Sequence, residues 1–413
     1  MNLDEICQII NGKMVNKKMI KINHIKTDSR LVEKGDLFIA INNGHKYIND
    51  VIDKCYVVSE INSTSDKVIM VDSTIEALGK LANYFRKLYD IPLIAITGST
   101  GKTTTKDLIY EVLSEKYKVL KNENNLNNNI GLPLTLLKLN NTYDLIVTEL
   151  GMNHFNEIAT LSKICEPNYS IITNIGSAHI GNLGSKKNIL KAKLEITTGM
   201  KDGLLILNND DKYLKKVKLN HLKISIKELK HIKYYIDKTT FIYKKQLFTF
   251  NMPGKHLLID VLIAIKIGEL FKVSNISQSI ANFKSLEGRL NIIHNKYTII
   301  DDCYNSSYEA LKGSLNIIKK DNRFKIIVLA DMLELGIYSL KYHLKIDKLL
   351  KKIKNKEVLL LGNDTKYITG KHFENTTTLI DYLKNIIKND SLVLVKGSNK
   401  FNLKEVVTAL KSK

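Results

Sequence analysis

Thr97-Gly98-Ser99-Thr100-Gly101-Lys102-Thr103-Thr104 is the stretch of this sequence whose residue types and spacing could do chemistry together. It closes an apolar run, Leu93–Thr97, so a buried strand would lead into a glycine-rich turn that opens a helix. The backbone N–H groups of such a turn bind phosphate oxygens. A lysine placed like Lys102 reaches the outer phosphates, and a hydroxyl placed like that of Thr103 ligates Mg²⁺. We therefore predict a nucleotide-phosphate loop, with binding residues Gly98, Ser99, Thr100, Gly101, Lys102, Thr103 and Thr104.

This loop is a shortened variant of the common phosphate-binding pattern. That pattern has a further glycine separated by four residues from the Gly-Lys pair, and position 96 is Ile here. An ordinary strand–turn–helix joint is the alternative interpretation. The Gly-Lys-Thr-Thr run after a strand-like segment favours the phosphate loop over that alternative.

Two other apolar runs also end in polar residues. Leu145–Thr148 is followed by Glu149, and Ser170–Thr173 is followed by Asn174 and, further on, by His179. Ligands of open α/β sheets bind beyond the carboxyl ends of the strands, so these ends would face one crevice. A carboxylate there can hold Mg²⁺, which prefers oxygen ligands. Each residue alone also fits a surface position or a cap, but together with the loop they favour a nucleotide–metal site.

The elements that must position these residues form an α/β protein in three parts. Residues 1–90 read as a small α/β unit, with helices expected at Leu3–Ile10 and Ile75–Leu88. Residues 91–288 read as a central, mostly parallel sheet with an antiparallel flank, because continuous apolar strands alternate with helices. The expected strands of the flank are short alternating segments such as Tyr234–Ile236 and Leu247–Phe250. Residues 289–413 read as a Rossmann-like α/β unit. Its expected strands are Thr298–Asp301, Lys325–Leu329, Val358–Leu361 and Leu392–Val395.

Composition narrows the class of protein. The chain has 413 residues, of which 44% are apolar and 25% charged, and it has no apolar run of about 18 residues. We therefore expect no membrane span, and the acidic start at Asp4 and Glu5 favours a cytoplasmic location over a signal peptide. The net charge of +21 is spread along the chain, which predicts no specific nucleic-acid partner. The four cysteines lack metal-site spacing, so free thiols are expected.

A series of motifs stands in order along the chain: TGSTGKTTTKD, NNIGLPLTLL, TELGMNH, NIGSAHIGNLGS, MPGKH, LEGRL, DDCYNSSYEALKGSL, ADMLELG and LVKGS. By these motifs, from Thr27 to about Lys400, the chain resembles the Mur ligases of peptidoglycan synthesis. The phosphate loop is shared with folylpolyglutamate synthases. TELGMNH, DDCYN and ADMLELG resemble the branch of the family that adds D-alanyl-D-alanine to UDP-N-acetylmuramoyl-tripeptide.

The resemblance implies an ATP-dependent ligase that forms an amide bond through an acyl phosphate, with catalytic residues Lys102, Glu149, His179 and Lys193. It implies that Thr103 and Glu149 hold one Mg²⁺ and that His179 and Lys193 hold a second. From the residues alone Lys193 reads as a solvated lysine, whereas the resemblance implies that it is carbamylated.

The same resemblance assigns the binding of nucleotide and substrates. It places ATP near Arg289, Asp302 and Asn305. It assigns the UDP-muramoyl peptide to residues 1–90, with Ser29 and Arg30, and D-alanyl-D-alanine to residues 289–413, with Lys396, Gly397 and Ser398. The chain departs from the family pattern at Leu194, at Leu257 and at Asn399-Lys400-Phe401.

Two kinds of alternative remain. Within the family, the chain could be the sibling ligase that adds the third amino acid, or a folylpolyglutamate synthase. In another class, it could be a nucleotide switch that binds nucleic acid through its basic surface. A third α/β unit carrying Asp302 and Asn305 favours the ligase, for which we expect a monomer.

Overall fold

The protein is described by a computed structural model that covers residues 1–16 and 19–411. Two compact units divide the chain. The first contains residues 1–95, 117–170 and 195–204, and the second contains residues 96–116, 171–194 and 205–413. The predicted boundaries near residues 90 and 288 stay predictions. The expectation of an α/β protein with parallel sheets is confirmed.

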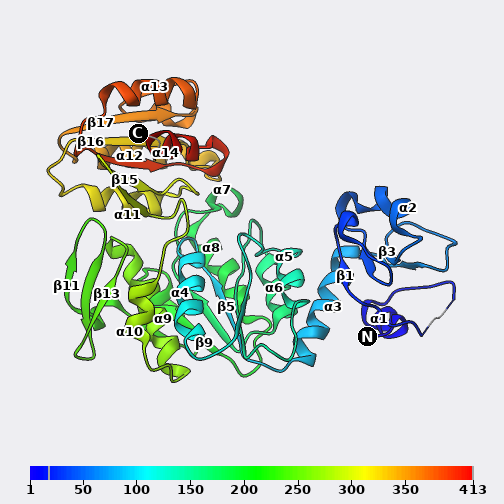
Figure 1. Cartoon of the computed structure of the whole chain (residues 1–413). Coiled ribbons are helices and arrows are strands. Elements are labelled where there is room, and N and C mark those ends of the chain that lie inside the picture. The colour runs from blue at the N-terminus through cyan, green and yellow to red at the C-terminus, as the bar shows by residue number, and fades with distance from the viewer. Residues whose placement is uncertain (17–18, 412–413) are drawn as a thin grey trace. The chain divides into compact units, whose positions relative to one another are not determined.

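The N-terminal part of the first unit is a four-stranded parallel sheet in the order β1-β2-β3-β4, packed on helices α1 and α3 (Figure 1). Helix α1 begins at a capping box, in which Asn2 accepts from the N–H of Glu5 and the Glu5 side chain accepts from that of Asn2. The elements are α1 (Leu3–Ile10), β1 (Ile25–Lys26), β2 (Leu37–Ile39), α2 (Ile48–Val51), β3 (Tyr56–Ser59), β4 (Val68–Met70) and α3 (Thr74–Leu88).

Helix α3 also packs against α5 (Gly131–Leu136) and α6 (Glu157–Cys165) of the same unit. Arg86 near the end of α3 is buried, and its Nε donates to the carbonyl of Cys165 at 2.9 Å. Its Nη2 donates to Oδ1 of Asn168 at 3.0 Å. These bonds satisfy the buried guanidinium and attach the end of α3 to the segment that leaves α6.

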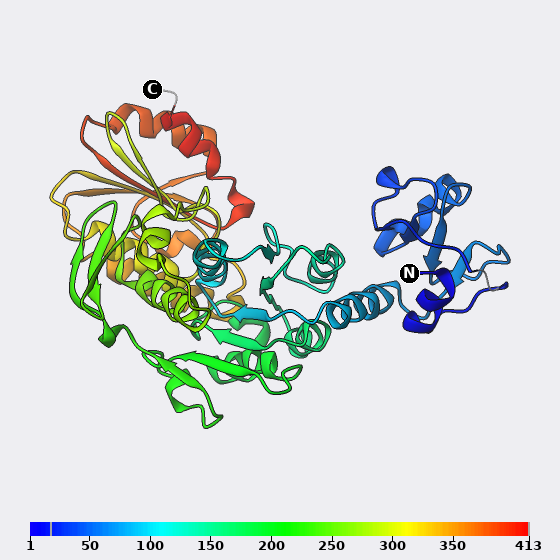
Figure 2. The ribbon, with the colours of Figure 1, turned by 60° about the horizontal axis from the view of Figure 1, so that its bottom comes forward.

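The central sheet has six strands in the order β10-β9-β8-β5-β7-β6. Nearly all of their residues are buried, as expected for strands covered on both faces. Helix α9, most of whose residues are apolar, packs along α4, the helix that follows the glycine-rich turn (Figure 2). The elements are β5 (Leu93–Thr97), α4 (Lys102–Ser114), β6 (Val119–Lys121), β7 (Leu145–Glu149), β8 (Tyr169–Ile172), α7 (Ile180–Leu183), α8 (Lys186–Leu194), β9 (Leu204–Asn208), β10 (Leu222–Ile224) and α9 (Leu258–Leu270).

The expected antiparallel flank is a separate three-stranded sheet, β11 (Lys230–Tyr234), β12 (Thr239–Tyr243) and β13 (Gln246–Phe250). The prediction of a strand at Tyr234–Ile236 was wrong, because β11 ends at Tyr234. A turn follows, in which the N–H of Tyr235 donates to the carbonyl of Lys238 at 2.9 Å. Helix α10 (Ile276–Asn282) packs against β13.

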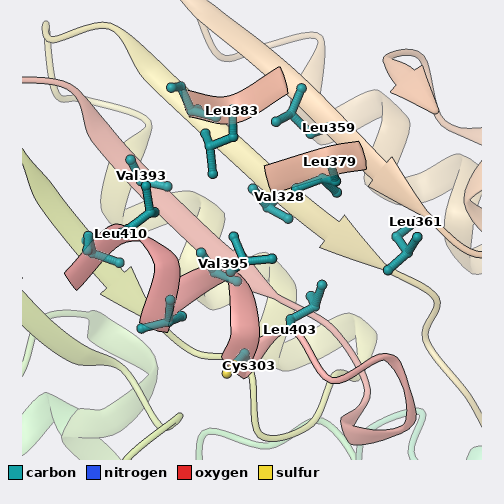
Figure 3. Packing of buried hydrophobic residues seen from close by; sticks show 14 of the residues in the cluster. Cys303, Val328, Leu359, Leu361, Leu379, Leu383, Val393, Val395, Leu403 and Leu410 are labelled. Atoms are coloured by element: carbon teal, nitrogen blue, oxygen red, sulfur yellow. The ribbon is translucent and has the colours of Figure 1, made fainter. Parts of the chain in front are cut away.

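The C-terminal part of the second unit is a six-stranded mixed sheet in the order β14-β15-β19-β16-β17-β18, with only β14 antiparallel to its neighbour. Helices α13 and α14 cover one face, where Leu379 and Leu403 pack over Val328 and Val395 (Figure 3). The elements are β14 (Asn291–His294), β15 (Thr298–Asp301), α11 (Tyr308–Ile318), β16 (Lys325–Ala330), α12 (Ser339–Leu350), β17 (Lys356–Leu361), β18 (Lys371–Phe373), α13 (Thr376–Ile386), β19 (Leu392–Lys396) and α14 (Lys404–Lys411).

No disulfide joins the four cysteines, all of which lie in the described part of the chain. Cys55, Cys165 and Cys303 are buried, and burial raises their pKa to about 11, about 12 and about 12. Among the described residues, no helix combines the length and the apolar composition that a membrane crossing requires.

Candidate functional site

The glycine-rich turn between β5 and α4 depends on two glycines. A Cβ on Gly98 would lie 1.8 Å from Oγ1 of Thr173. Gly101 precedes α4 with φ +82°, and a Cβ there would lie 2.7 Å from Oδ1 of Asp260. Only glycine fits both the left-handed backbone and the close approach, so these two positions define the path of the turn.

Residues after β8 hold the turn in place. The N–H of Thr100 donates to Oδ1 of Asn174 at 3.1 Å, and Nδ2 of Asn174 donates to the carbonyl of Thr100 at 2.9 Å. Oγ1 of Thr173 donates to the same carbonyl at 2.6 Å, and the N–H of Ser99 donates to the carbonyl of Asn174 at 3.1 Å. The residues that follow β8 therefore fix the backbone conformation of the turn.

Two side chains of the turn suit an anionic ligand. Nζ of Lys102 lies over the turn and donates to the carbonyl of Gly98 at 3.0 Å. Oγ of Ser99 is buried without a hydrogen-bond partner among the described residues. A buried hydroxyl is normally satisfied, so this one fits a group that accepts from it when bound. Thr103, the first-turn residue with a hydroxyl, is buried as well.

Asp260 lies behind the turn, in the first turn of α9, and is a residue that the sequence-based site did not include. It is fully buried, and its Oδ1 accepts from Oγ1 of Thr105 at 3.0 Å. Burial raises the pKa of this carboxyl well above its usual value, which favours the protonated form. The available signal was an aspartate in the first turn of a mostly apolar helix.

Lys193 lies near the end of α8 and is buried, in contrast to the solvated lysine that its composition suggested. Burial, and secondarily the positive charge of Lys102, lowers the pKa of its amine well below the usual value. A neutral amine is the form that a buried lysine takes when no carboxylate offsets the cost of its charge.

His179 follows β8 by a few residues and has φ +61°. Its Nδ1 lies 2.9 Å from Oε2 of Glu334, and this contact with the ring lowers the pKa of Glu334. The backbone joins the same two segments, because the N–H of Gly181 donates to the carbonyl of Glu334 at 3.0 Å. Glu334 was not among the predicted site residues, although it belongs to the quoted ADMLELG motif.

Asp302 and Lys396, predicted from separate motifs, pair with each other. Nζ of Lys396 lies 2.5 Å from Oδ2 of Asp302 and donates to the carbonyl of Asn305 at 3.1 Å. Oγ of Ser314 also donates to Oδ2 of Asp302, at 2.6 Å. Asp302 and Lys396 are buried, whereas Asn305 is exposed. The ammonium of Lys396, at the end of β19, is therefore bound to groups that follow the end of β15.

The other predicted residues of the second unit lie in the same C-terminal part. The guanidinium of Arg289 stacks on the ring of Tyr304, with 4.1 Å from Cζ to the ring centroid. Gly397 is buried, and a Cβ on it would lie 2.7 Å from Cβ of Ala330. Oγ of Ser398 donates to the carbonyl of Asp331 at 2.8 Å, so this hydroxyl connects two loops.

Three predicted residues belong to the first unit. Glu149 ends β7 as expected and is buried, and its Oε1 accepts from Nδ2 of Asn127 at 2.6 Å. Arg30 is exposed and forms a bidentate pair with Asp28, with distances of 2.9 and 2.6 Å, and Ser29 starts the same short 3₁₀ helix. This pairing holds the pKa of Asp28 at about 2.

The second unit thus assembles the phosphate loop, Lys193, His179 and the start of the C-terminal part from segments far apart in sequence. Residues 96–281 match the Mur ligase middle domain, and residues 288–399 match the Mur ligase glutamate ligase domain. The UDP-N-acetylmuramoyl-tripeptide–D-alanyl-D-alanine ligase of Bacillus subtilis is 32% identical, over 98% of this chain and 97% of the relative.

Solved structures of Mur ligases also resemble this chain over nearly its whole length. MurF from Acinetobacter baumannii superposes with a TM-score of 0.93 and 26% identity, covering 100% of this chain and 99% of that one. The MurF ligase from Thermotoga maritima, solved in complex with ADP, superposes with a TM-score of 0.88 and 25% identity, covering 94% and 97%.

Proposed function

Because the chain belongs to the Mur ligase family, we propose that it joins D-alanyl-D-alanine to UDP-N-acetylmuramoyl-tripeptide in an ATP-dependent reaction of peptidoglycan precursor synthesis. The observation that carries the proposal is the phosphate loop at the amino end of α4, where Ser99 and Lys102 suit the phosphates of ATP. The enzyme forms a C–N bond between a carboxylic acid and the amine of a dipeptide.

The reaction has two steps. The terminal carboxylate of the tripeptide attacks the γ-phosphorus of ATP, which gives an acyl phosphate and ADP. The amine of D-alanyl-D-alanine then attacks the acyl carbon, and phosphate leaves. Little covalent chemistry falls to the protein, since positioning and charge neutralisation dominate phosphoryl transfer. Lys102 offsets the negative charge that develops on the transferred group.

We also infer that the ligase uses two Mg²⁺ ions. Thr103 and Glu149 would supply a hydroxyl and a carboxylate oxygen to one, and His179 and Lys193 would hold the other. His179 would bind the metal through a ring nitrogen, and Nδ1 of this ring lies 2.9 Å from Oε2 of Glu334. When bound, Mg²⁺ supplies neutralisation of phosphate charge.

Lys193 suits this role only as a carbamate. Burial lowers the pKa of its amine and so favours the neutral form. A neutral amine adds to CO₂ to give an anionic carbamate with release of one proton. The product offers two oxygens where the unmodified side chain offers a nitrogen. Mg²⁺ prefers anionic oxygen ligands, so carbamylation converts an unsuitable side chain into a suitable one.

The remaining assignments concern the ends of the substrates. Ser29 and Arg30 would contact the UDP-muramoyl peptide, and Arg289, Asp302 and Asn305 would lie near ATP. The loop of Lys396, Gly397 and Ser398 would lie near the dipeptide. Because Lys396 and Ser398 are occupied by internal bonds, their contribution is to shape this loop. The expected enzyme is a cytoplasmic monomer, and its tripeptide carries lysine or diaminopimelate at the third position.

The test is a phosphate-release assay with chromatography of the products. Purified protein is given ATP, Mg²⁺ and UDP-muramoyl tripeptides containing lysine or diaminopimelate, together with D-alanyl-D-alanine or single amino acids. Phosphate and the pentapeptide product should form with the dipeptide. Parallel reactions contain a UDP-muramoyl dipeptide with a single amino acid, or a folate with glutamate. Product from the first would instead identify the sibling ligase, and product from the second would identify the synthase.

A further inference from the structure

Glu309, in the first turn of α11, uses both carboxylate oxygens on residues of the central part of the same unit. Its Oε2 accepts from the N–H of Ser177 at 2.8 Å and from Oγ of Ser177 at 2.7 Å. Its Oε1 lies 2.8 Å from Nζ of Lys186 on α8. Three donors thus bind this one carboxylate, and hydrogen bonds to an ionised acceptor are shorter and stronger than neutral ones.

The carboxylate also lies close to the phosphate loop. A Cβ built on Gly176 would lie 2.9 Å from Oε2 of Glu309 and 3.0 Å from Cβ of Ser99. The space beside this glycine is therefore filled by Glu309 from one segment and by Ser99 from the loop. A larger residue at position 176 would separate them.

The pair is ionised in this setting. Burial would raise the pKa of Glu309, but the charge of Lys186 and the bonds from Ser177 outweigh it and lower that pKa. Burial would likewise lower the pKa of Lys186, and Glu309 outweighs it and raises that pKa. Both side chains are about three-quarters enclosed, with 27% of each exposed, so solvent screens the pair only in part.

One short loop connects these contacts to the chemistry. The residues after β8, numbers 173–179, contain Asn174, which holds the backbone of Thr100, and His179, which faces Glu334. Ser177, held by Glu309, lies between them. Fixing Ser177 therefore limits the movement of both ends of this loop.

We propose that Glu309 is a positioning residue of the ligase. By binding Ser177 and Lys186, it keeps the phosphate loop, His179 and the C-terminal part in the relative positions, here called the register, that transfer of the acyl group to the amine requires. The inference rests on the proposed function. When the register is lost, water replaces the amine. Water then attacks the acyl phosphate, phosphate leaves, and the tripeptide carboxylate is regenerated with no amide formed.

The experiment measures released phosphate and amide product in parallel for Glu309→Ala, Glu309→Gln and the exposed control Glu374→Gln. For Glu309→Ala we expect kcat to fall by roughly 10²-fold, the cost of a displacement of about 1 Å at a reacting centre. KM for ATP should change little, and more than one phosphate should appear per amide bond. Glu309→Gln keeps an acceptor for Ser177 and should fall between Ala and wild type.

Wild-type kcat and one phosphate per product in both Glu309 variants would overturn the positioning role. Equal losses in Glu374→Gln would do the same, because they would show a general effect of removing a carboxylate. If Glu309→Ala does not fold, the ratio of released phosphate to amide product for Glu309→Gln decides whether the positioning role holds. If the wild-type protein itself makes no amide with D-alanyl-D-alanine, the proposed function fails, which is a different result from an unaffected variant.

Discussion

Lys186 and Lys193 lie seven residues apart on α8, and their surroundings shift their pKa values in opposite directions. Burial would lower the pKa of Lys186, but Glu309 outweighs it and raises that pKa. Lys193 is more deeply buried, and burial together with the charge of Lys102 lowers its pKa well below the usual value. Two helical turns separate the side chains on one face, so one helix carries a lysine whose charged form is favoured and a lysine whose neutral form is favoured.

The neutral amine leads to the first prediction. Lys193→Ala should lose most of the ligase activity, because no carbamate can form, and small carboxylic acids should partly restore it by filling the vacated space. Lys191→Ala, at an exposed position two residues away, should be close to wild type. Mass spectrometry under CO₂ would detect the carbamate directly. Full activity in Lys193→Ala, or sensitivity at Lys191 instead, would contradict the assignment.

Removing the loop lysine is expected to affect turnover more than folding. Lys102→Ala should lower kcat by roughly 10²–10³, the scale of losing one group that stabilises transition-state charge. Steady-state kinetics with saturating ATP measures the loss, and circular dichroism checks that the variant is folded. A folded variant with near wild-type turnover would rule out this nucleotide site.

The lowered pKa of His256 leads us to expect that the protein loses stability in mild acid. Its ring packs against Gly254 and Gly313, and burial lowers its pKa to about 4. Between pH 6.5 and 4 the unfolded chain binds a proton that the native ring does not, so stability falls as the pH falls. The full effect is at most about 3.5 kcal/mol, from about 1.4 kcal/mol per unit of pKa.

Thermal melts at pH 7 and pH 4.5 measure that contribution. His256→Gln removes the titrating group, so its melting temperature should decrease less between the two pH values than that of wild type. An identical decrease in both proteins would assign the acid sensitivity to other groups.

The buried pair of Asp302 and Lys396 should matter for stability more than for binding. Lys396→Met leaves an uncompensated buried carboxylate and should cost about 3–5 kcal/mol. Adding Asp302→Asn removes that charge, so the double variant should lose less than the sum of the single variants. Hydrogen exchange in β15 and β19 is the suitable measurement, because the loss should concentrate there. Additive losses would show that the two side chains do not depend on each other.

Much of the fold could be predicted because apolar runs and caps are local signals. Leu93–Thr97 is a buried strand with the predicted bounds, since nothing polar interrupts it before the glycine-rich turn. Leu3–Ile10 is a helix with the predicted bounds because its amino end carries a capping box. The prediction of a strand at Tyr234–Ile236 was wrong, because the alternating pattern of a polar segment does not show where the strand ends and the turn begins.

The partners of the site residues could not be predicted, because they come from distant segments. Asp260 lies more than 150 residues beyond the phosphate loop, and its chain position gives no indication that it would accept from Thr105. Glu334 and Glu309 belong to quoted motifs, yet only the folded chain shows which residue each one faces. The pairing of Asp302 with Lys396 is of the same kind, since β15 and β19 become neighbours only in the sheet.

The buried thiols can be used as chemical probes of local opening of the structure. A thiolate is the reactive form, and Cys55, Cys165 and Cys303 are shielded from solvent with raised pKa values, so alkylating reagents at neutral pH react with them slowly until the surrounding structure opens. One of them lies in each of the predicted segments 1–90, 91–288 and 289–413. The rate at which each peptide becomes labelled would therefore record the opening of each segment separately, in the unmodified protein and without an added dye.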